Sequence, residues 1–220
     1  MAAASALIAA AGSGERLGAG GPKAFVEIAG RSLLAWVVDA FRDAASIGSI
    51  VVAAPAGEEE RVASELGVEA VRGGEHRSDS VRAALELAAG EIAVVHDAAR
   101  PLVTPELIDL VVGRLAACPD ADGVVAASPV TDTIKQAGAG GAVERTLDRS
   151  RLWAVQTPQA FRVEPLRRAL EGDVSEATDD AMLVERDGGT VLVCEASVEN
   201  LKVTTPLDLS LAELILRDRE

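Results

Sequence analysis

Short apolar runs alternate along most of this chain with segments whose apolar residues recur at helical spacing. Residues 92–95 have the length and character of a buried strand, whereas residues 32–44 repeat Leu, Val and Phe on one helical face. The predicted strands are residues 5–10, 50–54, 68–71, 92–95, 124–127, 152–156, 191–194 and 201–203. The predicted helices are residues 32–44, 58–66, 78–89, 105–117, 165–170, 178–187 and 206–216, with Ser78 and Thr178 as caps. This order predicts an α/β fold, a mostly parallel sheet with helices on both faces.

Residues 128–150 break this alternation. Residues 132–135 and 143–147 flank the glycine-rich stretch 138–141, a pattern typical of a β-hairpin with a glycine tip. The hairpin is polar and offers few side chains to bury within its own domain. We therefore expect a projecting arm that packs on a second subunit, with a solvated loop as the alternative.

Length and composition indicate one globular domain over residues 1–220. Of the 220 residues 49% are hydrophobic, which is enough for one sizeable core. The formal net charge of −14 predicts a surface that repels nucleic acid and anionic membranes. No apolar run approaches the roughly 20 residues that a membrane span needs. Cys118 and Cys194 have no metal-ligand or CxxC spacing, so we expect two reduced thiols in a cytoplasmic protein.

The first predicted strand runs into a glycine-rich loop with two cations close behind. Residues 12–14 read Gly-Ser-Gly, and Arg16 and Lys23 follow them. Backbone N–H groups of such a loop bind phosphate, so the pattern predicts a nucleoside triphosphate site. The loop is neither a Walker A sequence nor GxGxxG, because no Gly-Lys-Ser/Thr follows it and Glu-Arg-Leu comes after the second glycine. Hydride chemistry is therefore not expected.

Two further loops follow predicted strands at the same edge of the sheet. Residues 73–81 lead from two glycines into a helix, which predicts an ordinary capped turn or, beside the first loop, backbone groups and a Ser80 hydroxyl that read a base or ribose. In the other loop Asp97 could hold Mg²⁺ or a ribose hydroxyl, and Arg100 a phosphate. The alternative is a local pair between these two side chains. We expect His96 to pack or to orient a neighbour.

Lysine is rare in this chain, which otherwise uses arginine as its cation. Of 21 basic residues 18 are arginine, and the lysines are Lys23, Lys135 and Lys202. Lysine supplies a compact point charge where arginine supplies a planar fork. The three lysines therefore either mark positions that need such a charge or are chance leftovers of the composition.

Short motifs in a fixed order link these loops to one enzyme family. They are residues 10–18 with Pro22 and Lys23, then residues 73–81, 96–101, 132–135, 147–149, 156–159, 177–180 and 200–204. Together they resemble the 2-C-methyl-D-erythritol 4-phosphate cytidylyltransferases of the non-mevalonate isoprenoid pathway, over nearly the whole chain. The resemblance implies a Rossmann-like nucleotidyltransferase fold, a three-layer sandwich, and a homodimer in which the arm at about 128–150 helps to complete the partner's active site.

The resemblance also implies roles for particular residues. It implies CTP-binding residues at Ala10, Ala11, Gly12, Ser13, Gly14, Gly74, Glu75 and Ser80, substrate-binding residues at Asp97, Arg100, Thr133, Thr157 and Thr178, and catalytic residues at Arg16, Lys23, Arg149 and Lys202. Mg²⁺ is the implied cation. Asp97 would touch it directly or through water, or CTP phosphates alone would hold it. Glu75 stands where the family commonly has Asp.

The implied reaction transfers CMP from CTP to 2-C-methyl-D-erythritol 4-phosphate and releases pyrophosphate. A phosphate monoester is largely dianionic near pH 7, so its attack on the α-phosphorus needs no general base, and the sequence offers none. Arg16, Lys23 and Mg²⁺ would stabilise charge on the triphosphate. Arg149 and Lys202 would hold the attacking phosphate in line. Two alternatives stay open: a cytidylyltransferase for another polyol phosphate such as ribitol 5-phosphate, and a non-catalytic nucleotide-binding module.

Overall fold

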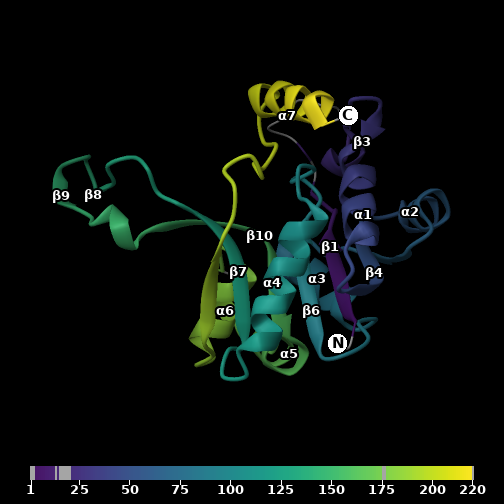
Figure 1. Ribbon diagram of the computed structural model, residues 1–220, viewed down its shortest axis with the longest axis horizontal. Coiled ribbons are helices and arrows are strands. Elements are labelled where there is room, and N and C mark those ends of the chain that lie inside the picture. Colours follow the sequence, from purple (N-terminus) through teal and green to yellow (C-terminus); the bar gives the residue numbers. More distant parts are fainter. Residues whose placement is uncertain (1–2, 13, 15–20, 175–176, 220) are drawn as a thin grey trace.

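A seven-stranded sheet forms the centre of the computed structural model, which describes residues 3–12, 14, 21–174 and 177–219 (Figure 1). The strands are β1 (Ala4–Ala9), β4 (Ile47–Ala54), β5 (Glu69–Arg72), β6 (Ile92–Asp97), β7 (Gly123–Pro129), β10 (Trp153–Arg162) and β11 (Val191–Glu195). Their order in the sheet is β11-β7-β10-β6-β1-β4-β5. Neighbouring strands are parallel except where β10 runs antiparallel to β6 and β7. The expected mostly parallel sheet is confirmed.

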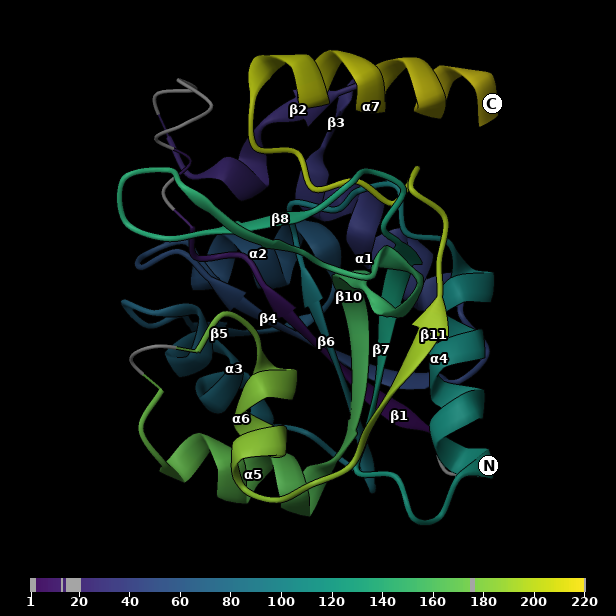
Figure 2. The same ribbon diagram turned by 90° about the vertical axis from the view of Figure 1, so that its left-hand side faces the viewer.

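Helices cover both faces of this sheet (Figure 2). They are α1 (Leu33–Asp43), α2 (Glu59–Leu66), α3 (Arg77–Leu85), α4 (Pro105–Ala117), α5 (Val163–Glu171), α6 (Asp180–Arg186) and α7 (Pro206–Arg219). On one face α1, α2 and α4 pack in an apolar cluster that includes Ile8, and on the other α3, α5 and α6 pack in a second cluster that includes Leu7. Successive strand residues point to opposite faces, so β1 serves both layers of a three-layer sandwich. In the described part of the chain, no helix combines the length and apolar character needed to cross a membrane.

Helix α7 packs on a third apolar cluster above the carboxyl ends of the strands. Its Ala212 and Leu216 lie against Leu33 and Val203. The predicted strand at 201–203 is wrong, because this segment is a loop in the structure. The Val203 N–H donates to the Ala99 carbonyl at 2.8 Å, and the Val203 side chain packs in the cluster under α7. These contacts hold the segment in place without strand pairing in the described structure.

Strand β10 is longer than the sequence predicts. The expected strand covered residues 152–156. In the structure β10 continues through Pro158 to Arg162, and its register against β7 shifts between Val155 and Gln159. The irregular step accommodates the proline, and it places the residues around it on a central strand of the sheet.

Helix α3 starts and ends earlier than expected. Its first residue is Arg77, and the Asp79 carboxylate accepts the His76 N–H at 3.2 Å. His76 is therefore the cap, two residues before the expected Ser78, because the carboxylate of Asp79, the third residue of the helix, accepts the His76 N–H. The helix ends at Leu85, so the predicted extension to residue 89 is wrong.

Helix α6 also has a different cap from the one expected. The Asp179 carboxylate accepts the Met182 N–H at 2.9 Å and makes Asp179 the cap. The predicted cap Thr178 lies outside the helix and is exposed. A carboxylate adds a favourable charge at a helix N-terminus, which explains why it takes the capping position. As a result Asp180 becomes the first residue of the helix.

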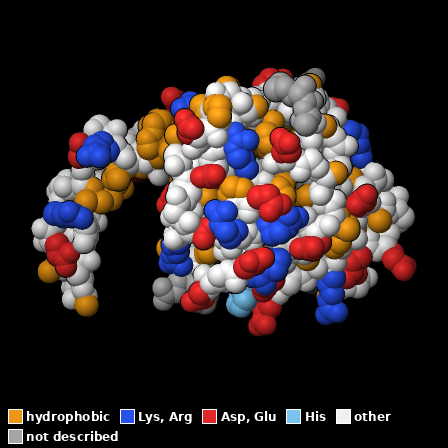
Figure 3. All heavy atoms as spheres, turned by 90° about the horizontal axis from the view of Figure 1, so that it is seen from below, with side chains coloured by type: hydrophobic (Ala, Val, Ile, Leu, Met, Phe, Trp, Pro, Cys, Tyr) orange, Lys and Arg blue, Asp and Glu red, His pale blue; other side chains and the backbone are white. Residues whose placement is uncertain are grey.

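The arm is a two-stranded hairpin that stands away from the body of the molecule (Figures 1 and 3). Its strands β8 (Lys135–Ala137) and β9 (Val143–Thr146) are antiparallel, and every residue in them is exposed. Gly140 and Gly141 have φ values of 102° and 80°, the region that suits a hairpin tip without side chains. The predicted hairpin is confirmed, but its first strand covers residues 135–137 and not the expected 132–135. Its contact with a second subunit stays a prediction.

Four short elements complete the described part of the fold. They are the strands β2 (Glu27–Ile28) and β3 (Arg31–Ser32) and the 3-10 helices η2 (Lys23–Phe25) and η3 (Arg149–Arg151). None of the four was expected from the sequence, since each is too short to show a period.

Candidate active site

The loops after β1, β5 and β6 meet at one edge of the sheet and surround a cavity of about 710 Å³. Main-chain bonds hold each loop to a neighbouring strand: the Ala10 N–H donates to Ala53 O of β4 at 3.0 Å, the Gly73 N–H to Ala54 O of β4 at 2.8 Å, and the Ala98 N–H to Ala9 O of β1 at 3.1 Å. Predicted site residues that line this larger cavity are Ala10, Ala11, Gly12, Gly14, Lys23, Gly74, Glu75, Ser80, Asp97 and Lys202. Ser13 and Arg16 lie outside the described residues. The three separate sequence motifs therefore form one site.

The turn after β5 lies close against the first loop because Gly73 has no side chain. A Cβ on Gly73 would lie 2.4 Å from the Ala11 Cβ, which no real contact allows. The Ser80 hydroxyl accepts the Gly74 N–H at 3.1 Å and donates to His76 O at 3.3 Å. Ser80 therefore lines the cavity and also holds the turn, and its hydroxyl proton is donated to His76 O.

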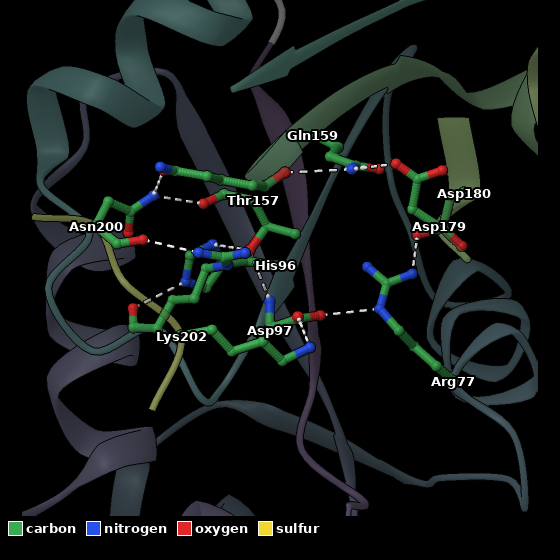
Figure 4. Close-up of polar contacts among 11 residues, drawn as sticks. Arg77, His96, Asp97, Thr157, Gln159, Asp179, Asp180, Asn200 and Lys202 are labelled. Carbon is green, nitrogen blue, oxygen red and sulfur yellow. Dashed lines mark hydrogen bonds and ion pairs between the residues drawn. The ribbon is translucent and has the colours of Figure 1, made fainter. Parts of the chain in front are cut away.

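Asp97, at the end of β6, is the charged centre of the site (Figure 4). Its Oδ1 accepts from Arg77 Nε at 2.8 Å, and its Oδ2 lies 2.7 Å from Lys202 Nζ. Burial by itself would raise the pKa of Asp97, but the two cations lower it well below its ordinary value. The alternative of a local pair between Asp97 and Arg100 is not what the structure shows, because Arg100 Nη1 donates to Asn200 O at 2.8 Å.

A second cavity of about 240 Å³ lies on the other side of these charges. It is lined by predicted substrate-binding residues Arg100, Thr157 and Thr178. Arg77, Asp97 and Lys202 line both cavities. We call these three residues the dividing wall.

His96 is a buried, neutral ring that contacts residues next to the dividing wall. Its Nδ1 lies 3.0 Å from the Thr157 Oγ1, and its Nε2 lies 3.2 Å from the Arg100 carbonyl. Thr157 Oγ1 also accepts the Asp97 N–H at 3.1 Å, so its own proton goes to Nδ1 and the ring proton sits on Nε2. Burial lowers the pKa of His96 to about 3. The ring therefore orients Thr157 and Arg100, as expected of an orienting residue.

Asn200 fixes the loop that carries Lys202, a role that the sequence analysis missed. Its side-chain Nδ2 donates to Gln156 Oε1 and to the Thr157 carbonyl, each at 2.8 Å. Asn200 is buried, which its sequence context does not reveal. Its place two positions before Lys202 is the signal that could have marked it. The loop and β10 are thus locked together beside the second cavity.

Replacing Thr157 by valine is expected to destabilise the protein by about 1–3 kcal/mol, because it leaves the Asp97 N–H and His96 Nδ1 unpaired in a buried place. Urea unfolding at pH 7 measures the change. Thr157→Ser keeps the hydroxyl and serves as the matched control. Equal stability of the valine and serine variants would contradict the assigned network.

Asp208 of α7 anchors the other end of the Lys202 loop. Its Oδ2 accepts the Thr204 hydroxyl at 2.7 Å and the N–H groups of Thr204 and Thr205 at 2.9 and 2.8 Å. These hydrogen bonds lower the pKa of Asp208 to about 2, and the bond from the Thr204 hydroxyl has the largest effect. Because the folded pKa is depressed, the stabilisation is present above the unfolded pKa of about 4 and is lost as the pH falls through about 2.

We therefore expect Asp208→Asn to lower the unfolding free energy at pH 7 and to lower it less at about pH 3. Urea unfolding of both proteins at the two pH values measures this. A difference that is the same at both would show that the Asp208 charge does not anchor the loop.

Two predicted residues on the arm do not reach either cavity of their own chain. Thr133 and Arg149 are exposed, and Arg149 donates to the Thr131 carbonyl within the arm. Neither lines the larger or the second cavity in the described part of the structure. One chain therefore brings together the body residues of the predicted site and leaves its arm residues outside.

Two described carboxylates, Glu75 and Asp97, line the larger cavity, and of these two Asp97 also lines the second cavity. Among the described residues no three His, Cys, Asp or Glu side chains gather as a metal site. Asp97 faces both cavities, and its two oxygens already accept from Arg77 and Lys202. Carboxylate oxygens have further lone pairs, and Mg²⁺ is commonly held by one carboxylate plus phosphates and water. The residues fit an ion that arrives with a polyphosphate.

Comparisons with known proteins extend these observations to the whole chain. The family described as 2-C-methyl-D-erythritol 4-phosphate cytidylyltransferase matches residues 4–218. The protein of that name from Saccharopolyspora erythraea is 47% identical, over 96% of this chain and 98% of the relative. Its counterpart from Rubrobacter xylanophilus is 47% identical, over 100% of this chain and 97% of the relative.

Solved structures agree with the sequence relatives. The crystal structure of 2-C-methyl-D-erythritol 4-phosphate cytidylyltransferase from Thermus thermophilus matches with a TM-score of 0.80 and 36% identity, over 99% of this chain and 100% of that chain. The 4-diphosphocytidyl-2C-methyl-D-erythritol synthase from Anaerococcus prevotii matches with a TM-score of 0.85 and 27% identity, over 97% and 95%. On this evidence the chain belongs to the 2-C-methyl-D-erythritol 4-phosphate cytidylyltransferase family.

Proposed function

We propose that this chain transfers CMP from CTP to 2-C-methyl-D-erythritol 4-phosphate, giving 4-diphosphocytidyl-2-C-methyl-D-erythritol and pyrophosphate. The observation that supports this most is the dividing wall, where Asp97 holds Lys202 between two cavities. An ammonium at that boundary can neutralise phosphate oxygens that arrive from either side. A reaction in which one phosphate attacks another needs such a charge.

The triphosphate would lie in the larger cavity along the loop after β1. Backbone N–H groups near Gly12 and Gly14 would contact phosphate oxygens, and Lys23 would add a positive charge. Arg16 would supply a second cation from the segment outside the described residues. Ala10, Ala11, Ser13, Gly74, Glu75 and Ser80 complete the proposed CTP site.

The second cavity would hold the polyol phosphate. Arg100 and Lys202 would bind its phosphate, while Thr157 and Thr178 would face its hydroxyl groups. Arg100 Nε has no hydrogen-bond partner among the described residues, which leaves donor capacity in that guanidinium. The cavity is small, as a compact five-carbon substrate requires.

In the proposed step a substrate phosphate oxygen forms a bond to the α-phosphorus of CTP. The bond from that phosphorus to the oxygen bridging to the β-phosphate breaks, and its electron pair leaves with pyrophosphate. The attacking phosphate is largely dianionic at pH 7 and gives up no proton to a base. His96 is not needed as one, since its ring is neutral and committed to Thr157 and Arg100.

We propose Mg²⁺ as the divalent cation. Asp97 is the carboxylate of this chain that would hold it, directly or through water, together with triphosphate oxygens. When bound, the ion would withdraw charge from the phosphates that react. Asp97 would also keep Lys202 oriented toward the attacking phosphate.

We further propose a homodimer in which each arm completes the partner's site. Thr133 and Arg149 support this, because both are exposed and belong to the arm, which stands away from the body that carries the cavities (Figure 1). A hairpin with every strand residue exposed has little to stabilise it alone.

Cys118 and Cys194 are free thiols, which agrees with the predicted cytoplasmic location. The net charge of −14 supports the absence of a nucleic acid partner.

The test is pyrophosphate release from CTP and Mg²⁺ with 2-C-methyl-D-erythritol 4-phosphate or ribitol 5-phosphate as acceptor. We expect release with the first and little with the second. Preference for ribitol 5-phosphate would move the proposal to another polyol phosphate. Release with neither acceptor would contradict the transferase proposal and favour a nucleotide-binding module.

A further inference from the structure

Arg77 joins two carboxylates that come from distant parts of the chain (Figure 4). Its Nε donates to Asp97 at 2.8 Å, and its Nη1 donates to Asp180 at 2.5 Å. Asp97 ends β6, and Asp180 begins α6 on the far side of the second cavity. The planar fork of one arginine can serve both carboxylates at fixed angles, which an ammonium cannot.

Asp180 is an anchor whose only role in the described structure is to hold Arg77. Its side chain is 0% exposed, and its Oδ1 has no hydrogen-bond partner among the described residues. Asp180 lines neither cavity, so it would not touch a substrate. A buried carboxylate is costly unless a cation is paired with it, so its place here points to the orientation of Arg77.

We propose that Arg77, anchored by Asp180, is a positioning residue that sets how Asp97 shares its charge with Lys202. This inference rests on the proposed function of the second cavity as the polyol phosphate site. Arg77 occupies Oδ1 of Asp97, which leaves Oδ2 for Lys202. Lys202 is the more exposed of the two cations, with 41% of its side chain open against 26% for Arg77.

The arrangement keeps Lys202 available to an incoming phosphate. With Arg77 in place, the Asp97 charge is divided between two cations, and the pull on the ammonium is moderate. Without Arg77, both Asp97 oxygens can turn to Lys202, and the polyol phosphate must compete with an undivided carboxylate. The triphosphate loses less, because Lys23 and the loop after β1 remain.

The experiment compares the double variant Arg77→Gln/Asp180→Asn, the single variant Asp180→Asn and a control by steady-state kinetics and urea unfolding. Arg77→Gln alone leaves Asp180 buried without its cation and can fail to fold. The double variant Arg77→Gln/Asp180→Asn removes both charges together. Asp180→Asn alone keeps an acceptor oxygen for Arg77. The matched control is Arg82→Gln, because Arg82 is an exposed arginine on the same helix and lines neither cavity.

For the double variant we expect kcat/KM for 2-C-methyl-D-erythritol 4-phosphate to fall about 10- to 100-fold, through a higher KM and a lower kcat. The KM for CTP should stay within about twofold, and Asp180→Asn and Arg82→Gln should remain near wild type. Unchanged kinetics in the double variant, or an equal rise in both KM values, would overturn the positioning role. Wild-type protein that releases no pyrophosphate would instead overturn the proposed function itself.

Discussion

Replacing Lys23 by alanine is expected to lower kcat about 10²- to 10³-fold, the cost of removing one preorganised charge that stabilises a transition state. Lys23 follows the loop after β1 and lines the larger cavity, where negative charge would build on the leaving pyrophosphate. Its N–H also donates to Gly12 O at 3.2 Å, so the backbone contact that shapes the loop survives the substitution. The variant should therefore fold with near-native stability. Single-turnover rates with saturating CTP give the size of the chemical effect.

The control for Lys23→Ala is Arg217→Ala, which removes an exposed cation from α7. Within the described part of the chain, Arg217 pairs with Glu213 one turn away on the surface, and such pairs contribute little. It separates the loss of a site charge from the loss of overall positive charge in an acidic protein. A fully active Lys23→Ala variant would defeat the assignment of the triphosphate to the larger cavity.

Mixing two inactive variants, Arg149→Ala and Lys202→Ala, is expected to restore about a quarter of the wild-type activity through statistical formation of mixed dimers. Each variant alone should lose about 10²-fold or more, since each removes a charge at the attacking phosphate. Arg149 lies on the arm and Lys202 on the body. A mixed dimer would then have one site with both residues intact. The measurement is pyrophosphate release after the subunits have exchanged.

The matched control mixes Lys23→Ala with Lys202→Ala, two changes in the body of the same site. Both residues line the larger cavity of one chain, so a mixed dimer has no site with both intact. Recovery in this control would show that activity returns for another reason. Absence of recovery in the arm mixture, with subunit exchange demonstrated, would mean that the arm does not cross to the partner.

Much of the fold was predictable because it follows from alternation. Strands buried on both faces are continuous apolar runs, so β1, β4 and β6 stood out, and the helices between them showed their apolar faces. The carboxyl ends of parallel strands share one edge, which brought Gly12 and Gly14 together with residues of the segments 73–81 and 96–101, as expected. Both steps use local sequence and one topological rule.

The pairing of charges in the site was not predictable, because it depends on which loops meet in space. Asp97 and Arg100 are three residues apart and resemble a local pair, yet the carboxylate binds Arg77 and Lys202. Arg77 itself resembles an ordinary polar residue at a helix start. Its second partner Asp180 is 103 positions away, beyond any spacing rule. The prediction also ended β10 at residue 156, before Pro158. The sheet accommodates this proline through a shift of register between Val155 and Gln159.

The root of the arm has a mechanical consequence. The arm leaves the body where β7 and β10 meet, with Trp153 paired to Pro129 and Val155 to Ala127. Further along β10 lies Thr157, in the lining of the second cavity. Strand β10 thus links the base of the arm to the lining of the second cavity, through the irregular step between Val155 and Gln159. We expect a displacement of the arm to move the lining of the second cavity through β10. Contact between the arm and a partner would then also affect the shape of that cavity.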